Sequence, residues 1–284
     1  MDKILLINKE KGYTSRDVVN KISKHFNERK VGHFGTLDPL ATGLLVIGMG
    51  AYTKLGNLLS DESKCYIATV FVGKSTDTYD ITGNTLSISN DRISSDEIIS
   101  ALDSFKGTYN QEVPIYSAVK VNGKKLYEYA RNSKSVDLPR RDVTIYDISF
   151  ISTYEKDGNQ YFRFSCHVSK GTYIRSLIND ISKKLGVLMC MSDLERVKCG
   201  NLSISSSYTI SDVLNDNFSF LDIGDVLDLE RREVPVSLGR KIFNGSLIDV
   251  MSSKYILFTY NGKDIALYGK YKDFMKPYLV FKND

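Results

Sequence analysis

Two segments of this 284-residue sequence predict a β-hairpin. Residues 143–151 and 160–169 are rich in β-branched and aromatic side chains, and the turn sequence KDGN lies between them at 156–159. This pattern is typical of two antiparallel strands joined by a tight turn. The hairpin indicates a sheet that is mixed or largely antiparallel.

Patterns typical of helices alternate with further strand-like segments along the chain. Apolar side chains recur at helical spacing in some segments and form short continuous runs in others. The predicted strands span 4–7, 44–47 and 65–72. Four helices are predicted: one capped by Ser15, one that carries Leu55 and Leu58, one capped by Ser94 or Ser95, and one that spans 173–185 and ends before Gly186. We therefore expect an α+β fold in which helices flank a mixed, mostly antiparallel sheet.

The sequence divides into a large domain and a small one. Residues 1–233 contain the patterns above and form the expected main domain. Within it, a segment of about 106–147 has two prolines, several tyrosines and many lysines and arginines, and we expect it to form an inserted lobe. From 234 to 284, short strand-like runs separated by Asn-Gly turns predict a small, mostly β module.

Composition limits the kinds of site that the chain can build. It has four cysteines, none in a C-x-x-C pair, and three histidines, so we predict no zinc site. The acidic stretch Asp77–Asp80 suggests a divalent cation, but structural capping is the alternative that we favour. No run is long and apolar enough for a membrane span or a signal peptide, and we expect a cytoplasmic protein.

The formal net charge of +4 does not by itself indicate a nucleic-acid partner. The charges are nevertheless unevenly distributed along the chain. Basic residues outnumber acidic ones in 1–54, 106–148, 163–200 and 235–284, and acidic residues outnumber basic ones in 55–105 and 201–234. One basic face would produce such blocks, although chance produces them as well.

The most unusual stretch is GHFGTLDPLATGLL at 32–45. Three glycines permit backbone conformations that other residues disfavour, and Pro39 fixes φ next to the single carboxylate, Asp38. An apolar strand follows at once. Functional residues are often found on such constrained loops. The alternative is that Asp38 only forms an Asx-turn ahead of Pro39.

The longer run GHFGTLDPLATGLLVIGMGAYTK at 32–54 resembles the catalytic motif of the TruB-type bacterial tRNA pseudouridine synthases. Other blocks resemble the remaining family motifs in family order: KCY (64–66), TDTYD (76–80), VPIYSAVK (113–120), GKKLYEYAR (123–131), SKGTYIRSL (169–177) and LER (194–196). The resemblance implies a pseudouridine-synthase-like fold and the conversion of uridine 55 in the tRNA T-loop to pseudouridine. The match after 233 is looser and implies a PUA-like module.

The resemblance also implies roles for individual residues. Asp38 would be the nucleophile, attacking either the uracil ring or the ribose C1′, and Arg175 would pair with it and keep it ionised and oriented. Tyr66 would stack on the flipped uracil and is a candidate for proton transfer. Contacts to the substrate would come from His33, Lys54, Lys120, Lys124, Lys125, Tyr127, Arg131, Tyr173 and Leu194.

Breaking and remaking a glycosidic bond needs a nucleophile, a proton carrier and a dry pocket, and it needs neither a metal nor a cofactor. The resemblance accordingly implies tRNA as substrate, with no cofactor, no guide RNA, no obligate protein partner, and a monomeric state. The main alternative is a tRNA-folding chaperone that acts by binding rather than by isomerisation. A nucleotide-binding metabolic enzyme is disfavoured because the sequence has neither a P-loop nor a G-x-G-x-x-G motif.

Overall fold

A computed structural model describes residues 1–60, 62–132, 134–227, 229–250, 252 and 254–281. Its main sheet consists of β1 (Ile4–Lys9), β2 (Val31–His33), β3 (Thr42–Met49), β4 (Lys64–Val72), β7 (Gly107–Glu112), β10 (Arg140–Lys156), β11 (Asn159–Val168), β12 (Met189–Cys199) and β13 (Leu202–Ser203). The strand order is β1-β3-β12-β4-β11-β10-β7, with β2 beside β3 and β13 beside β12. Only the β3–β12 pair is parallel within the described sheet, which confirms the expected α+β fold.

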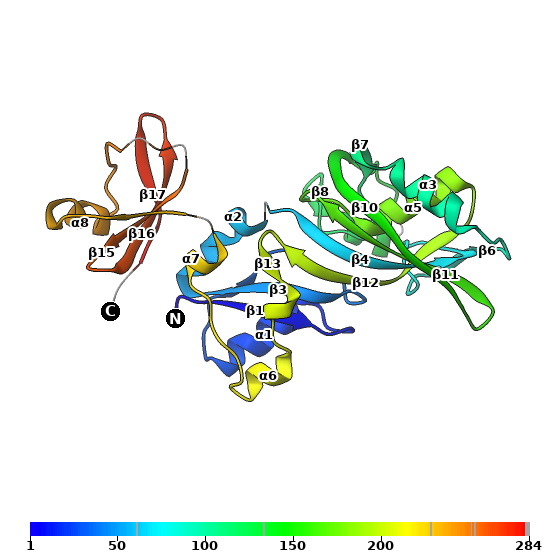
Figure 1. Ribbon diagram of the computed structural model, residues 1–284, viewed down its shortest axis with the longest axis horizontal. Coiled ribbons are helices and arrows are strands. Elements are labelled where there is room, and N and C mark those ends of the chain that lie inside the picture. The colour runs from blue at the N-terminus through cyan, green and yellow to red at the C-terminus, as the bar shows by residue number, and fades with distance from the viewer. Residues whose placement is uncertain (61, 133, 228, 251, 253, 282–284) are drawn as a thin grey trace.

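Helices lie on both faces of this sheet (Figure 1). The helices found in the described residues are α1 (Ser15–His25), α2 (Gly56–Ser60), α3 (Ser95–Asp103), α4 (Leu126–Arg131), α5 (Ile174–Leu185), α6 (Ile210–Leu214), α7 (Ile223–Val226) and α8 (Val236–Phe243), with 3₁₀ helices η1 (Gly50–Leu55) and η2 (Ile204–Ser206). Alternate residues of β1 enter separate cores. Leu5 and Ile7 belong to the core that also contains residues of α1, α3, α5 and α6, whereas Ile4 and Leu6 belong to the core that contains residues of η1, α7 and the C-terminal strands.

The start of α1 differs from the sequence prediction. Thr14, and not Ser15, is the N-cap residue, because its side chain accepts from the Asp17 amide and Asp17 accepts from Thr14 in a capping box. Ser15 is instead buried and binds the main chain of Leu37, next to Asp38. The residue predicted to cap a helix therefore fixes the loop of interest.

The predicted hairpin is present and longer than its sequence pattern. Strands β10 and β11 extend to 156 and 159, and a two-residue turn at Asp157 (φ 51°) and Gly158 (φ 73°) joins them. Two left-handed residues match the right-handed twist of the strands, which is why an Asp-Gly pair is favoured there. β10 also pairs with β7 along its first half.

The range 106–147 does not leave the sheet as one lobe. Its first part is the edge strand β7 and its last part is the beginning of β10, so the portion outside the sheet spans 113–139. We call residues 113–139 the insertion segment. It contains β8 (Lys120–Val121), β9 (Lys124–Lys125) and α4. A second small hairpin, β5 (Lys74–Thr76) with β6 (Thr85–Ile88), flanks the acidic stretch.

The C-terminal sheet is ordered β14 (Glu230–Glu233), β15 (Ile256–Tyr260), β16 (Lys263–Tyr271) and β17 (Phe274–Val280). Figure 1 shows it standing at one end of the molecule with α8. Two details differ from expectation: β14 begins before 234, and α8 was not predicted, since Asn244 caps this helix instead of forming a strand turn. Tyr52 and Phe281 join the sheet to the main domain at a ring distance of 5.7 Å. No described helix has the length and apolar character needed to cross a membrane.

Candidate active site

The loop that carries Asp38 joins β2 to β3 and is held on both sides. The Ser15 hydroxyl donates to the Leu37 carbonyl at 3.1 Å and accepts from the Leu37 amide at 2.9 Å. From the other side, the Arg196 guanidinium donates to the Gly35 carbonyl at 3.0 Å. Gly35 has a φ of 110°, and a Cβ there would lie 3.3 Å from the Arg196 guanidinium, so glycine permits this approach. These contacts fix the main chain just before Asp38.

Arg175 binds the Asp38 carboxylate directly. Its Nε lies 2.9 Å from Oδ2 of Asp38, a charge-assisted hydrogen bond. The other two guanidinium nitrogens donate to the carbonyls of Thr78 at 3.2 Å and Tyr116 at 3.1 Å. Arg175 is 5 % exposed, whereas the Asp38 side chain is 37 % exposed. The buried arginine therefore orients a carboxylate that a ligand can still reach.

Arg175 occupies the first turn of α5, and the sequence explains why this turn faces the loop. Gly171, at a φ of 79°, reverses the chain, and Tyr173 becomes the N-cap residue of α5. Leu177, Ile178 and Ile181 bury the helix in the main core. The amphipathic pattern thus sets the rotation of α5, and the tight turn sets where it begins.

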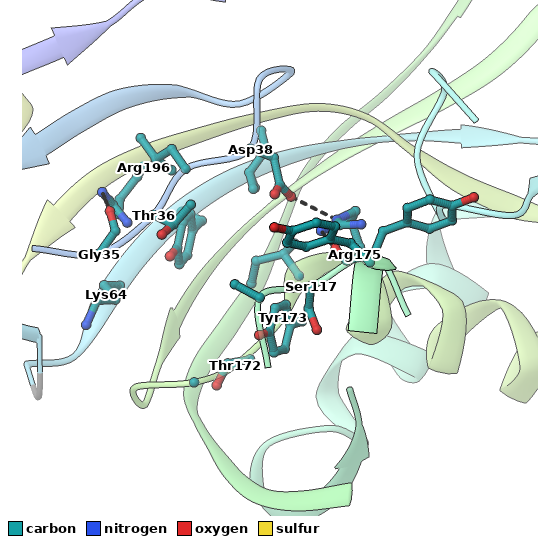
Figure 2. A pocket seen from close by; sticks show the side chains of 17 residues that line it. Gly35, Thr36, Asp38, Lys64, Ser117, Thr172, Tyr173, Arg175 and Arg196 are labelled. Carbon is teal, nitrogen blue, oxygen red and sulfur yellow. Dashed lines mark hydrogen bonds and ion pairs between the residues drawn. The ribbon is translucent and has the colours of Figure 1, made fainter. Parts of the chain in front are cut away.

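A cavity of about 500 Å³ lies between the Asp38 loop and the start of α5. Figure 2 shows Asp38 and Arg175 joined at its wall, with Thr172 and Tyr173 on the helix side and Gly35, Thr36 and Arg196 on the loop side. The remaining lining residues include Tyr66, Tyr116, Tyr127 and Leu194. A cavity of this size with aromatic walls and one accessible carboxylate suits a planar organic ring.

Tyr66 forms part of this wall from β4 and lies opposite Arg196 of β12. Burial raises the pKa of the Tyr66 phenol, and the Arg196 guanidinium beside it acts in the opposite direction. Arg196 is 1 % exposed and also donates to the Leu44 carbonyl at 2.7 Å. Gly43 pairs with Arg196 at a φ of 97°, where a Cβ would lie 2.4 Å from the Arg196 carbonyl oxygen. The fit between β3 and β12 therefore requires glycine.

Residues 23–174, more than half of the chain, match the family model described as TruB family pseudouridylate synthase, N-terminal domain. The chain belongs to the TruB family of pseudouridylate synthases. It is therefore an isomerase of the pseudouridine synthase type, and the resemblance seen in its motifs is confirmed.

Individual TruB-family relatives extend the match over the whole chain. The tRNA pseudouridine synthase B of Lactobacillus johnsonii is 36 % identical over 100 % of both chains. The protein of the same name from Staphylococcus aureus is 44 % identical over 214 residues, which are 74 % of this chain and 70 % of the relative. A chain from a solved Cbf5–Nop10–Gar1 complex has a TM-score of 0.70 at 23 % identity, covering 94 % of this chain and 78 % of that chain, and so shares the fold.

The structure places several of the residues predicted from the TruB-type motifs at the cavity and others away from it. Tyr127, Tyr173 and Leu194 line it together with the three predicted catalytic residues. His33 lies on β2, outside the lining, and burial lowers its pKa. Lys54 does not reach the cavity, because η1 packs on the other face of the sheet, and it borders a separate cleft beside the C-terminal sheet.

Two of the four basic residues predicted on the insertion segment lie over the Tyr127 ring. Lys125 Nζ lies 5.4 Å from the centre of the Tyr127 ring, and the Arg131 guanidinium lies at the same distance. Lys120 and Lys124 are exposed on the small β8–β9 hairpin. The insertion segment therefore brings Lys125 and Arg131 next to the cavity wall and contributes two aromatic residues, Tyr116 and Tyr127, to the lining.

Sequence reasoning gave no role to three charged residues at or beside the cavity, Lys9, Lys64 and Arg196. Arg196 was noted only as part of the LER block, although a charged residue within an apolar strand was a usable signal. Lys9 follows the first predicted strand and is fully buried, and its Nζ donates to the carbonyls of Glu10 at 3.0 Å and Tyr13 at 2.7 Å. Burial lowers the pKa of Lys9 to about 8, while the Asp38 charge opposes this shift and Arg196 adds to it.

The acidic stretch Asp77–Asp80 caps its own loop. The Asp80 carboxylate accepts from the hydroxyls of Thr78 at 2.9 Å and Thr82 at 2.6 Å and from the Thr82 amide at 3.0 Å. Asp77 accepts from Asn84. Across the described residues, no group of three or more histidine, cysteine or acidic side chains is arranged to hold a metal ion. The loop thus keeps the Thr78 carbonyl in place for Arg175.

Proposed function

We propose that this chain converts uridine 55 in the T-loop of tRNA to pseudouridine, with Asp38 as the nucleophile. The observation that carries the proposal is the accessible Asp38 carboxylate bound by buried Arg175 at the edge of a cavity with tyrosine walls. A base that is to be modified must leave its stack, and such walls receive it. The names of the full-length relatives support tRNA as the substrate.

The reaction breaks the bond between uracil N1 and ribose C1′ and forms a bond between C5 and C1′. One proton leaves C5 and one is delivered to N1, so atoms and charge balance without a cofactor. Asp38 attacks either the ring or C1′, and both routes need a carboxylate held in line with its target. Tyr66 is the proposed stacking and proton-transfer residue. Burial raises the pKa of its phenol, so the residue holds its proton, and the neighbouring Arg196 charge opposes that shift.

The basic groups beside the cavity support RNA binding by the chain itself, without a guide RNA. Lys120, Arg140, Arg141 and Lys170 line a second cleft, which adjoins the active cavity at Gly171. Cationic side chains bind phosphates, and an aromatic ring such as Tyr127 stacks on unpaired bases. We place the insertion segment against the T-loop, with Lys124, Lys125 and Arg131 toward the backbone. A cytoplasmic monomer is the corresponding proposed state.

The direct test is to incubate the protein alone with unmodified tRNA transcripts and to map pseudouridine at single-nucleotide resolution. Product is expected at position 55 and absent from a matched transcript with cytidine at that position. Product at another uridine would contradict the site specificity. Dependence on an added RNA or protein fraction would contradict independence from guides and partners.

A binding-only function makes a different prediction. A tRNA-folding chaperone has no need of the Asp38–Arg175 pair, whereas an isomerase does. A strain that lacks the endogenous activity should be complemented for pseudouridine content by the wild-type protein and not by Asp38→Asn. Restoration of growth by Asp38→Asn without restored pseudouridine would assign the cellular benefit to binding.

A further inference from the structure

Gln111 makes an unusual set of contacts behind the cavity wall. It lies on β7, is 0 % exposed, and does not line the cavity. The Tyr173 amide donates to its Oε1 at 2.8 Å, and its Nε2 donates to the Tyr173 carbonyl at 3.1 Å. The same Nε2 donates to the Tyr109 hydroxyl at 2.6 Å. One side-chain amide thus satisfies both main-chain groups of Tyr173, as a neighbouring β-strand would.

Tyr173 is the residue on which the start of α5 depends. It is the N-cap residue of α5 and makes no capping hydrogen bond with its own side chain. Its carbonyl accepts from the Leu177 amide at 3.0 Å, the first hydrogen bond of the helix, and it accepts from Gln111 as well. Because Arg175 follows two residues later, a shift of the Tyr173 main chain moves both the Tyr173 ring and the Arg175 guanidinium.

Gln111 also connects this helix start to the insertion segment. β7 ends at Glu112, and the insertion segment begins with the next residue. Four residues after β7, the Tyr116 carbonyl accepts from Arg175. On the adjacent strand β10, the Arg141 guanidinium lies 5.6 Å from the centre of the Tyr173 ring. Gln111, Tyr116 and Arg141, which lie close to the ends of the insertion segment, therefore contact the start of α5. Gln111 binds the main chain of Tyr173, Arg141 lies over its ring, and Tyr116 binds the end of the Arg175 side chain.

We propose that Gln111 is a positioning residue for the isomerisation: it holds the start of α5 so that Tyr173 faces the cavity and Arg175 reaches Asp38. Through β7, it ties this geometry to the segment proposed to bind RNA. The inference rests on the proposed function of Asp38 and Arg175, and it adds a residue that touches neither the cavity nor the reacting atoms.

The chain contains a matched control for this residue. Gln160 on β11 is 8 % exposed and pairs in the same way with one main-chain residue, Ile93. The Ile93 amide donates to Oε1 at 3.0 Å, and Nε2 donates to the Ile93 carbonyl at 2.7 Å. Ile93 precedes Ser94, the N-cap residue of α3, and neither lines the active cavity. Both glutamines thus hold the start of a helix, and only one of these helices carries a predicted catalytic residue.

The experiment compares Gln111→Leu with Gln160→Leu in the full-length protein. Each variant removes the side-chain amide that binds one main-chain amide and one carbonyl, and we expect similar decreases in the thermal unfolding midpoint. Gln111→Leu should lower kcat on the order of 10- to 100-fold with an unchanged Kd for tRNA, because a displaced catalytic group costs rate more than binding. Gln160→Leu should leave kcat at the wild-type value. Equal kcat values for wild type and Gln111→Leu, or equal losses in both variants, would overturn the inference.

Amide hydrogen exchange tests the same contact without turnover. In Gln111→Leu, the Tyr173 amide should lose its protection, while amides in the last turn of α5 keep theirs. Wild-type protection at Tyr173 in this variant would refute the role of Gln111 even if the enzyme were inactive for another reason. If Gln111→Leu does not fold, Gln111→Glu, which keeps the acceptor and removes the donor, is measured in the same way. Failure of the wild-type protein to modify position 55 would count against the proposed function alone.

Discussion

Two buried arginines stand on opposite sides of the cavity, and they bind different kinds of partner. Arg175, on the helix side, pairs with the Asp38 carboxylate and with two carbonyls from distant loops. Arg196, on the sheet side, binds the carbonyls of Leu44 and Gly35. Within the described part of the chain, no carboxylate lies within ion-pair distance of Arg196. Arg175 thus binds an accessible carboxylate, whereas Arg196 binds main-chain carbonyls.

The difference shows how the site combines rigidity with reactivity. Arg196 lies in a sheet register that fixes it between β3 and β4, and a buried cation there is tolerated because dipolar carbonyls surround it. Arg175 instead connects three loops, those of Asp38, Thr78 and Tyr116, which are not paired with one another in the sheet. We therefore expect substitutions on the helix side to affect turnover first and substitutions on the sheet side to affect stability first.

The largest effect is expected for Asp38→Asn. The amide keeps an acceptor for Arg175 but is not a nucleophile, so turnover should fall on the order of 10⁴-fold or more while the fold is retained. Release of tritium from tRNA that carries 5-³H-uridine measures this loss. A parallel binding assay should give the wild-type Kd for tRNA. Substantial residual tritium release would remove Asp38 from the role of nucleophile.

Arg175→Lys tests the helix side at constant charge. An ammonium group does not have the planar fork that reaches Asp38, Thr78 and Tyr116 together. We expect kcat to fall on the order of 10²-fold, because the carboxylate loses its fixed orientation. Single-turnover kinetics would separate this loss from slow product release. A variant with wild-type kcat would show that charge alone is sufficient on this side.

Arg196→Met tests the sheet side. The change leaves two carbonyls near the Asp38 loop without this donor, so the free energy of unfolding should fall by about 1–3 kcal/mol. Urea denaturation followed by circular dichroism measures this change. At a temperature where the variant is folded, its kcat should exceed that of Arg175→Lys. A fully stable and inactive Arg196→Met protein would contradict the division between the two sides.

The last prediction is a dependence of stability on pH that arises from the buried Lys9. Burial lowers its pKa in the folded state to about 8, below its usual 10.5. Between these values the unfolded chain binds more protons, so the contribution of Lys9 to stability rises with pH, by at most about 1.4 kcal/mol per pH unit. The unfolding free energy of the wild type should therefore increase relative to Lys9→Met between about pH 8 and about pH 10. An identical pH profile for the two proteins would contradict this shift.

Much of the fold followed from local patterns. The hairpin of β10 and β11, the capped helix at Ser94 and the left-handed end of α5 at Gly186 were predicted because side-chain periodicity and turn residues act over a few positions. Predictions were less accurate where tertiary contacts outweigh local preference. Ser15 binds Leu37 instead of capping α1, and α8 forms where short strands were expected.

The candidate site shows the same division. Motif positions identified Asp38, Tyr66, Arg175, Tyr173 and Leu194, and the structure brings all five to one cavity. Lys54 also lies in a matching motif, but η1, which carries it, packs on the other face of the sheet. Lys9 and Arg196 had weak signals because burial of a charge depends on neighbours from distant strands.

By itself, the sequence determined the family, the alternation of strands and helices, and the residue types available for chemistry, since these depend on short-range patterns. Only the tertiary structure decided which of these residues meet. The Asp38 loop, the Thr78 carbonyl, the base of the insertion segment and the first turn of α5 converge on one guanidinium. The physical reason is that such contacts depend on hydrogen-bond geometry between segments far apart in the chain, which no local propensity encodes.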